Sequence, residues 1–154
     1  MVYLQRKPFS MSHSLTKIWI HAIWSTKERF PFIIPSVELN VHAFMQKDLE
    51  ELDCPVRAIN GMPDHVHCLF LLNPQKAIAD LIKQVKGSSS HWINDQDLIK
   101  AKFSWQMGYA AYSVSESSLE KVQGYILNQK EHHCKVTFQK EYDEFIRVHG
   151  LQLQ

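Results

Sequence analysis

The sequence predicts an α+β fold in which helices pack against an antiparallel sheet. Segments rich in β-branched and aromatic residues alternate with amphipathic segments, in the order strand, helix, strand, strand, helix, strand, helix. The chain has 154 residues, which suits one domain, and 45% of them are hydrophobic. A chain of this size buries enough surface to fold without disulfides or a structural metal.

The first half of the chain supplies a strand, a helix and a second strand. Residues 15–24 are aromatic and β-branched, as in a buried strand. Prolines at 31 and 35 make the following connection irregular, and Ser36 is a plausible N-cap for a helix over 37–52. A short strand is expected at 56–60, followed by a turn at 61–64.

The second half begins with a strongly apolar strand at 65–72. Asn73 and Pro74 then read as the start of a helix whose apolar stripe continues to Val85 and which loosens near 87–90. We expect a further strand over 103–114, bent at Gly108. Ser117 and Glu120 have the spacing of a capping box, which predicts a last helix reaching about His133.

Composition excludes several classes of protein. The 17 Lys and Arg residues balance 16 Asp and Glu residues, which argues against a strongly basic nucleic-acid coat but permits a local basic groove. No apolar run approaches the about 18–20 residues of a membrane span, so we expect no membrane partner. No secretory signal is evident, and the three cysteines lack CxxC spacing, which favours free thiols and a cytoplasmic location. Residues 1–13 are expected to be a flexible N-terminal extension and 14–150 a single domain.

The most informative residues are His65 and His67. Side chains alternate along a strand, so these two imidazoles project from one face and can bind one divalent metal ion. An isolated pair of this kind is more often two unrelated histidines that hydrogen bonds satisfy. The pair alone therefore leaves both interpretations open.

A polar row on the last predicted helix adds a second cluster. Tyr125 and Gln129 lie four residues apart on one helix face, and His132 falls on the same side. The row is either a solvated helix surface or a nucleophile and a neutral oxygen ligand beside a metal. By contrast, consecutive helical residues diverge by about 100°, so we interpret His132, His133 and Cys134 as surface or packing residues rather than a metal cluster. His21 reads as a core histidine, with a role near a metal less expected.

Taken together, these segments resemble the single-tyrosine HUH transposases of small prokaryotic insertion sequences, including the REP-associated tyrosine transposases. The His-Val-His strand matches the HUH motif, and YILNQKEHH at 125–133 matches the helix of the nucleophile. Supporting matches are HAIWSTKER at 21–29, LIKQVKGSSS at 81–90 and WQMGYAAYSVS at 105–115. The resemblance covers about residues 14–149 and makes 14–150 a single HUH transposase-like domain.

The resemblance implies a ferredoxin-like (RRM-like) sandwich with the two histidines on a central strand. It implies that Tyr125 is the nucleophile, and that His65, His67 and Gln129 hold Mg²⁺ or Mn²⁺. The implied activity is metal-dependent cleavage and rejoining of single-stranded DNA at hairpin ends through a 5′-phosphotyrosine. It further implies a homodimer in which the tyrosine helix of one subunit completes the histidine site of the other.

Basic and hydroxyl side chains near these motifs are candidates for DNA contact, because lysine, arginine and serine bind phosphate oxygens. A solvated surface or helix end is a comparable interpretation for them. The candidates are Lys17, Lys27, Arg29, Lys83, Lys86, Ser88 and Ser89.

Two other functions remain open at this stage. One is a domesticated protein that binds hairpin DNA with little or no strand transfer, although such a protein needs no intact tyrosine and histidine set. The other is a metal-dependent hydrolase or oxygenase that combines the histidine pair with a carboxylate such as Asp64.

Overall fold

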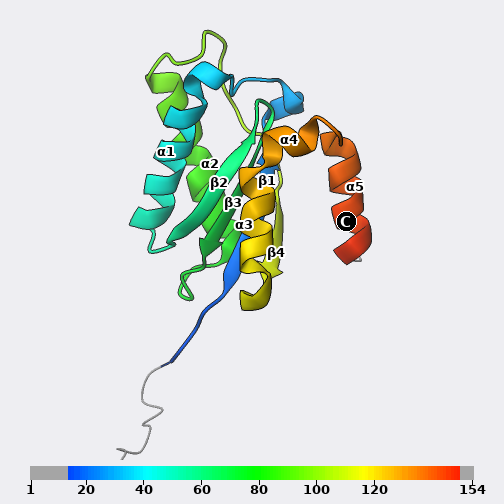
Figure 1. Ribbon diagram of the computed structural model, residues 1–154. Coiled ribbons are helices and arrows are strands. Elements are labelled where there is room, and N and C mark those ends of the chain that lie inside the picture. The colour runs from blue at the N-terminus through cyan, green and yellow to red at the C-terminus, as the bar shows by residue number, and fades with distance from the viewer. Residues whose placement is uncertain (1–13, 150–154) are drawn as a thin grey trace, which may run out of the picture.

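The computed structural model describes residues 14–149, and the predicted extension at 1–13 lies outside them. Its centre is a four-stranded sheet in the order β2-β3-β1-β4, in which all neighbouring strands are antiparallel (Figure 1). The strands are β1 (Trp19–Ser25), β2 (Val56–Met62), β3 (His65–Leu71) and β4 (Ala110–Val114). The predicted histidine strand is thus one of the two central strands.

Helices cover both faces of the sheet, which confirms the predicted α+β class. On one face lie α1 (Pro35–Glu51) and α2 (Ile78–Asp95), which complete a ferredoxin-like β-α-β-β-α-β order. The other face carries α3 (Leu119–Leu127), then the short α4 (Gln129–His133) and α5 (Phe138–His149), as Figure 1 shows. Among the described residues, no helix is long and apolar enough to span a bilayer.

Alternation along β3 assigns its side chains to two different environments. Val66, Cys68 and Phe70 are buried in the main hydrophobic core, together with residues of α1 and α2. Leu69 belongs to a smaller cluster with Leu119 and Ile126 of α3. The apolar stripe of α3 therefore holds this helix on the face of the sheet that carries the two β3 histidines.

The hairpin between β2 and β3 depends on Gly61. This residue pairs with Val66, and a Cβ atom built on it would lie 2.1 Å from the backbone oxygen of His65. Any larger residue must push the two strands apart. Gly61 and Met62 are still in the strand, so the turn is shorter than the sequence predicts and contains only Pro63 and Asp64.

Several predicted boundaries are wrong for local reasons. The strand predicted at 103–114 begins only at Ala110, because Gly108 has a φ of 84° and interrupts the extended chain. Ser117 makes no capping hydrogen bond, since the chain enters α3 through a 3₁₀ turn at Glu116–Ser118. α1 and α2 likewise begin without side-chain caps, at Pro35 and Ile78.

The C-terminal part of the described chain differs most from expectation. The helix predicted to reach His133 is divided at Asn128 into α3 and α4. A further helix, α5, follows, which the sequence analysis did not predict. Both differences bear directly on the candidate site.

Candidate active site

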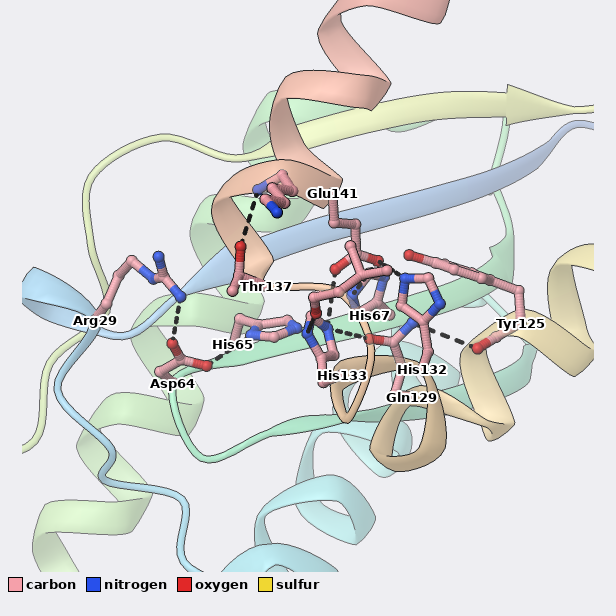
Figure 2. A network of polar contacts seen from close by, with 12 residues as sticks. Arg29, Asp64, His65, His67, Tyr125, Gln129, His132, His133, Thr137 and Glu141 are labelled. Carbon is pink, nitrogen blue, oxygen red and sulfur yellow. Dashed lines mark hydrogen bonds and ion pairs between the residues drawn. The ribbon is translucent and has the colours of Figure 1, made fainter.

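His65 and His67 lie beneath α3, α4 and α5 with side chains that are 1% and 0% exposed (Figure 2). The Nδ1 atom of His65 is 2.7 Å from Asp64 Oδ1, and Nδ1 of His67 is 2.9 Å from His21 Nε2. With a proton on each Nδ1, both histidines keep the lone pair on Nε2. Neither Nε2 atom has a hydrogen-bond partner among the described residues.

His133 of α4 joins this pair from above the sheet. Its ring centroid is 4.9 Å from that of His65, and its Nδ1 is 2.9 Å from the backbone oxygen of Val136. Its Nε2 faces Gln129 Oε1 at 2.9 Å. The break between α3 and α4 places Gln129 at the start of α4, where it is fully buried.

Glu141 of α5 provides a carboxylate on the same side (Figure 2). Its Oε2 is 2.9 Å from His133 Nε2, and its Oε1 is 3.8 Å from His67 Nε2. Neither Glu141 oxygen has a hydrogen bond among the described residues. One ligand atom from each of His65, His67, His133 and Glu141 lies within 4.8 Å of all the others.

This donor set fits a divalent cation. Burial of a carboxylate without a hydrogen bond is costly, and a cation would offset that cost. Burial lowers the pKa of His67 well below its ordinary value, and the charges of neighbouring histidines lower it further. Burial also lowers the pKa of His133, whereas it raises the pKa of Glu141 to about 7, with the charge of Asp64 adding to that rise. Neutral imidazoles are the form that binds metals.

Tyr125 projects from α3 toward these histidines. Its ring centroid is 5.8 Å from that of His67, 6.2 Å from that of His21 and 5.1 Å from that of His132. It lines a pocket of about 300 Å³, and Lys140 and Glu141 also line this pocket. The tyrosine and the histidine cluster of one chain therefore meet on one face of the sheet.

Arg29 and Asp64 form the far end of the network in Figure 2. Arg29 Nη2 donates to Asp64 Oδ2 at 2.8 Å, and the guanidinium lies 4.3 Å from the ring centroid of Phe138. Burial alone would raise the pKa of Asp64, but hydrogen bonds from His65 and Arg29 hold it at about 2. Asp64 thus stays ionised and orients the ring of His65.

The family model for IS200-like transposases matches residues 14–129, which include both β3 histidines, Tyr125 and Gln129. This chain belongs to that family. The ISDra2 transposase TnpA of Deinococcus radiodurans is 30% identical over 114 residues, which cover 71% of this chain and 81% of that protein. The resemblance to the single-tyrosine HUH transposases is confirmed, and with it a role in DNA recombination.

Solved structures agree with this assignment. A crystal structure assigned to a transposase from Deinococcus radiodurans R1 is 28% identical, with a TM-score of 0.62, and the match covers 75% of this chain and 93% of that chain. The structure of a REP-associated tyrosine transposase bound to a REP hairpin is 15% identical, with a TM-score of 0.59, over 82% of this chain and 76% of that one. The second likeness shows a shared fold.

Within this IS200-like transposase, the predicted DNA-contact residues have different surroundings. The ammonium groups of Lys27 and Lys83 have no partner among the described residues, and Arg29 lines a pocket of about 410 Å³ beside His65. Lys17 pairs with Glu116 at 2.7 Å. These side chains remain candidates for phosphate contact.

The other three candidates bind groups of the protein itself. Lys86 Nζ donates to the backbone oxygens of Gln106 and Gly108, each at 2.7 Å. The Ser88 hydroxyl donates to Asp48. Ser89 is fully buried, where its hydroxyl donates to the backbone oxygen of Val85 and accepts the indole N–H of Trp105. As placed, Ser89 does not reach the surface at which DNA would bind.

The sequence analysis did not place His133 and Glu141 in the cluster of possible metal ligands. It also gave little weight to a role for His21 beside that cluster. His133, interpreted as a surface or packing residue, has a side chain that is 6% exposed and an Nε2 that lies in the cluster, whereas Cys134 is exposed. His21 is buried like a core residue, yet it hydrogen bonds to His67. Glu141 was missed because α5 was not predicted, although Phe138, Glu141 and Tyr142 already had helical spacing.

Proposed function

We propose that this transposase cleaves and rejoins single-stranded DNA at hairpin ends through a 5′-phosphotyrosine on Tyr125. The observation that carries the proposal is the meeting of Tyr125 with buried, unpaired metal-donor atoms beside a pocket. A tyrosine attacks phosphorus efficiently only where nearby positive charge stabilises the phenolate and the attacked phosphate. The imidazole nitrogens and the carboxylate near Tyr125 are atoms that can hold a cation, which would supply this positive charge.

The residues proposed to hold the ion are His65, His67 and Gln129, with Mg²⁺ or Mn²⁺ as the ion. When bound, such an ion draws electron density from the scissile phosphate and so favours nucleophilic attack. His65 and His67 each present Nε2 into the cluster. Gln129 Oε1 lies 2.9 Å from Nε2 of His133, which belongs to the same cluster. Asp64 and His21 hold the first two rings in place from their other nitrogen atoms.

The chain's own nucleophile then performs the transfer. Tyr125 loses its phenolic proton, and its oxygen forms a bond to phosphorus while the bond from phosphorus to the 3′-oxygen breaks. The departing 3′-oxygen takes up a proton and becomes a free hydroxyl group. Attack by another 3′-hydroxyl reverses the step and rejoins strands without ATP, because one phosphodiester replaces another.

Substrate binding is proposed to depend on a local basic surface around the two pockets. Arg29 lies beside His65, and Lys140 lines the pocket next to Tyr125. Lys17, Lys27 and Lys83 lie outside these two pockets, Lys83 on α2 on the other side of the sheet, and would contact the DNA backbone farther from the reacting phosphate. The net charge of +1 argues against tight binding to any duplex and favours recognition of a folded hairpin by shape.

A homodimer remains part of the proposal. Exchange of the tyrosine helix between subunits is not required to complete the site, because Tyr125 already faces His67 of its own chain. A dimer would then serve to hold two DNA ends at once.

The test is formation of a covalent adduct. Labelled single-stranded hairpins from the DNA that flanks the gene are incubated with the full chain and Mn²⁺, and the products are resolved on a denaturing gel. We expect a protease-sensitive adduct that disappears in Tyr125→Phe and persists in Tyr109→Phe, a control at an exposed tyrosine. Cleavage without an adduct in both variants would support a hydrolase instead, and binding without cleavage would support a hairpin-binding protein.

A further inference from the structure

We propose that Glu141 of α5 and His133 of α4 are metal ligands, so that three imidazoles and one carboxylate hold the ion. The inference rests on the proposed function only in that it concerns the same site. It extends the proposed ligand set of His65, His67 and Gln129. It also places α5, which lies beyond the residues that the family model matches, inside the active site.

The first observation is a shared arrangement of the three imidazoles. Each Nδ1 faces a partner outside the cluster: the carboxylate of Asp64 for His65, the ring of His21 for His67 and the carbonyl of Val136 for His133. Each Nε2 points inward. Metal-binding histidines characteristically donate the proton of one ring nitrogen to such a partner and offer the other nitrogen to the ion.

The second observation is the position of the Glu141 carboxylate. Its side chain is 4% exposed, and its oxygens are 2.9 Å from Nε2 of His133 and 3.8 Å from Nε2 of His67. An ion with bonds of about 2.1 Å holds its ligand atoms no more than roughly 4.2 Å apart. The 4.8 Å spread of the cluster therefore closes around an ion with small side-chain movements.

A third observation concerns Gln129. Its Oε1 and Glu141 Oε2 are both 2.9 Å from His133 Nε2. If His133 donates its Nδ1 proton to Val136, its Nε2 has no proton to share, and three electron-rich atoms then face one another. A cation among them removes this repulsion and takes Gln129 as a further oxygen donor.

The ligand set also predicts which ion is bound. Imidazole nitrogens favour first-row transition metals, whereas Mg²⁺ prefers oxygen ligands and retains its water molecules. A site with three imidazoles and a carboxylate therefore favours Mn²⁺ over Mg²⁺. We expect the chain to bind Mn²⁺ at least tenfold more tightly than Mg²⁺.

The competing explanation is a structural ion pair between Glu141 and a protonated His133, and Glu141→Gln separates the two. The matched control is Glu144→Gln, which removes the same charge from an exposed position on α5. Mn²⁺ affinity of the full chain is measured without DNA, from the loss of the free-ion signal in electron paramagnetic resonance. Thermal unfolding is followed with and without Mn²⁺.

For metal ligation, we expect Glu141→Gln to weaken Mn²⁺ binding at least tenfold and to reduce the stabilisation by Mn²⁺, while the metal-free variant unfolds no earlier than the parent. Glu144→Gln should stay within twofold of the parent. An ion pair predicts the reverse: unchanged Mn²⁺ affinity and a lower unfolding temperature without metal. That result would overturn the inference, as would a metal-free variant that does not fold.

These outcomes are separable from those of the proposed function. If the parent binds Mn²⁺ through Glu141 but forms no DNA adduct, the ligand assignment stands and the strand-transfer proposal fails. If the adduct forms and Glu141→Gln binds Mn²⁺ like the parent, only the ligand assignment fails.

Discussion

His21 on β1 hydrogen bonds to His67 on β3, with 2.9 Å between Nε2 of His21 and Nδ1 of His67. The two rings are nearly stacked, with centroids 5.2 Å apart, and both side chains are buried. His21 therefore fixes the orientation of the His67 ring, and with His67 Nδ1 as the donor it leaves the lone pair of Nε2 for a metal ion. It is a positioning residue for the candidate metal site.

The first prediction concerns this contact. Phenylalanine at position 21 keeps a planar aromatic ring, although a larger one, and removes the nitrogen atoms, so His67 loses the partner of its Nδ1. We expect His21→Phe to weaken Mn²⁺ binding by about 10- to 100-fold. Calorimetric titration with Mn²⁺ measures the effect, and His91→Phe, at an exposed histidine of α2 on the other side of the sheet, should leave the affinity unchanged.

A second prediction concerns the hairpin that carries the HUH strand. A Cβ atom at position 61 would collide with backbone rather than with a flexible side chain, so Gly61→Ala must shift β2 or β3. We expect it to lower the free energy of unfolding by about 1–3 kcal/mol, as for overpacked cores. Urea unfolding measures this loss. The control Gly87→Ala, in α2 with nothing within 4 Å, should be neutral or slightly stabilising.

The elements that sequence reasoning found are those whose patterns are local. The apolar composition of β3 predicted its burial, and the alternation of side chains along a strand predicted that His65 and His67 share a face. Helix α2 followed from its apolar stripe in the same way. The ferredoxin-like arrangement and the role of Tyr125 as nucleophile came from the family resemblance. That resemblance rests on matching sequence motifs and not on a physical derivation.

The parts that were missed depend on contacts between residues far apart in sequence. His21 and His67 meet only because β1 pairs with β3, a register that one strand's pattern does not contain. Glu141 reaches the cluster because α5 folds back over the sheet after the turn that follows α4. The division of α3 from α4 at Asn128, and with it the place of His133 in the cluster, was likewise not predicted from the local pattern.

A third prediction separates two lysines of α2. Lys86 bridges to the carbonyls of Gln106 and Gly108, so Lys86→Met leaves both acceptors without this donor. We expect a loss of about 1–2 kcal/mol in the free energy of unfolding, the lower part of the range for charged hydrogen bonds because Lys86 is partly exposed.

Lys83 on the same helix is exposed and without a partner among the described residues. Lys83→Gln should leave unfolding unchanged but weaken binding of the DNA hairpin and reduce the slope of log affinity against log salt by about 1. Fluorescence anisotropy at several salt concentrations measures this. An unaltered salt slope would remove Lys83 from the proposed DNA surface.

The last prediction concerns His42, which lies on α1 away from the candidate metal ligands. Burial lowers its pKa; Glu38 acts in the opposite direction, and Lys130 lowers the pKa further. The unfolded chain therefore takes up a proton near pH 6.5 that the folded chain rejects, so the free energy of unfolding falls as the pH drops below about 6.5. One such proton accounts for a slope of up to about 1.4 kcal/mol per pH unit.

His42→Gln cannot take up this proton. Urea unfolding between pH 7.5 and 5.5 should therefore show a shallower loss of the free energy of unfolding in this variant than in the parent. An equally steep loss in the variant would show that other groups, not His42, cause the acid sensitivity.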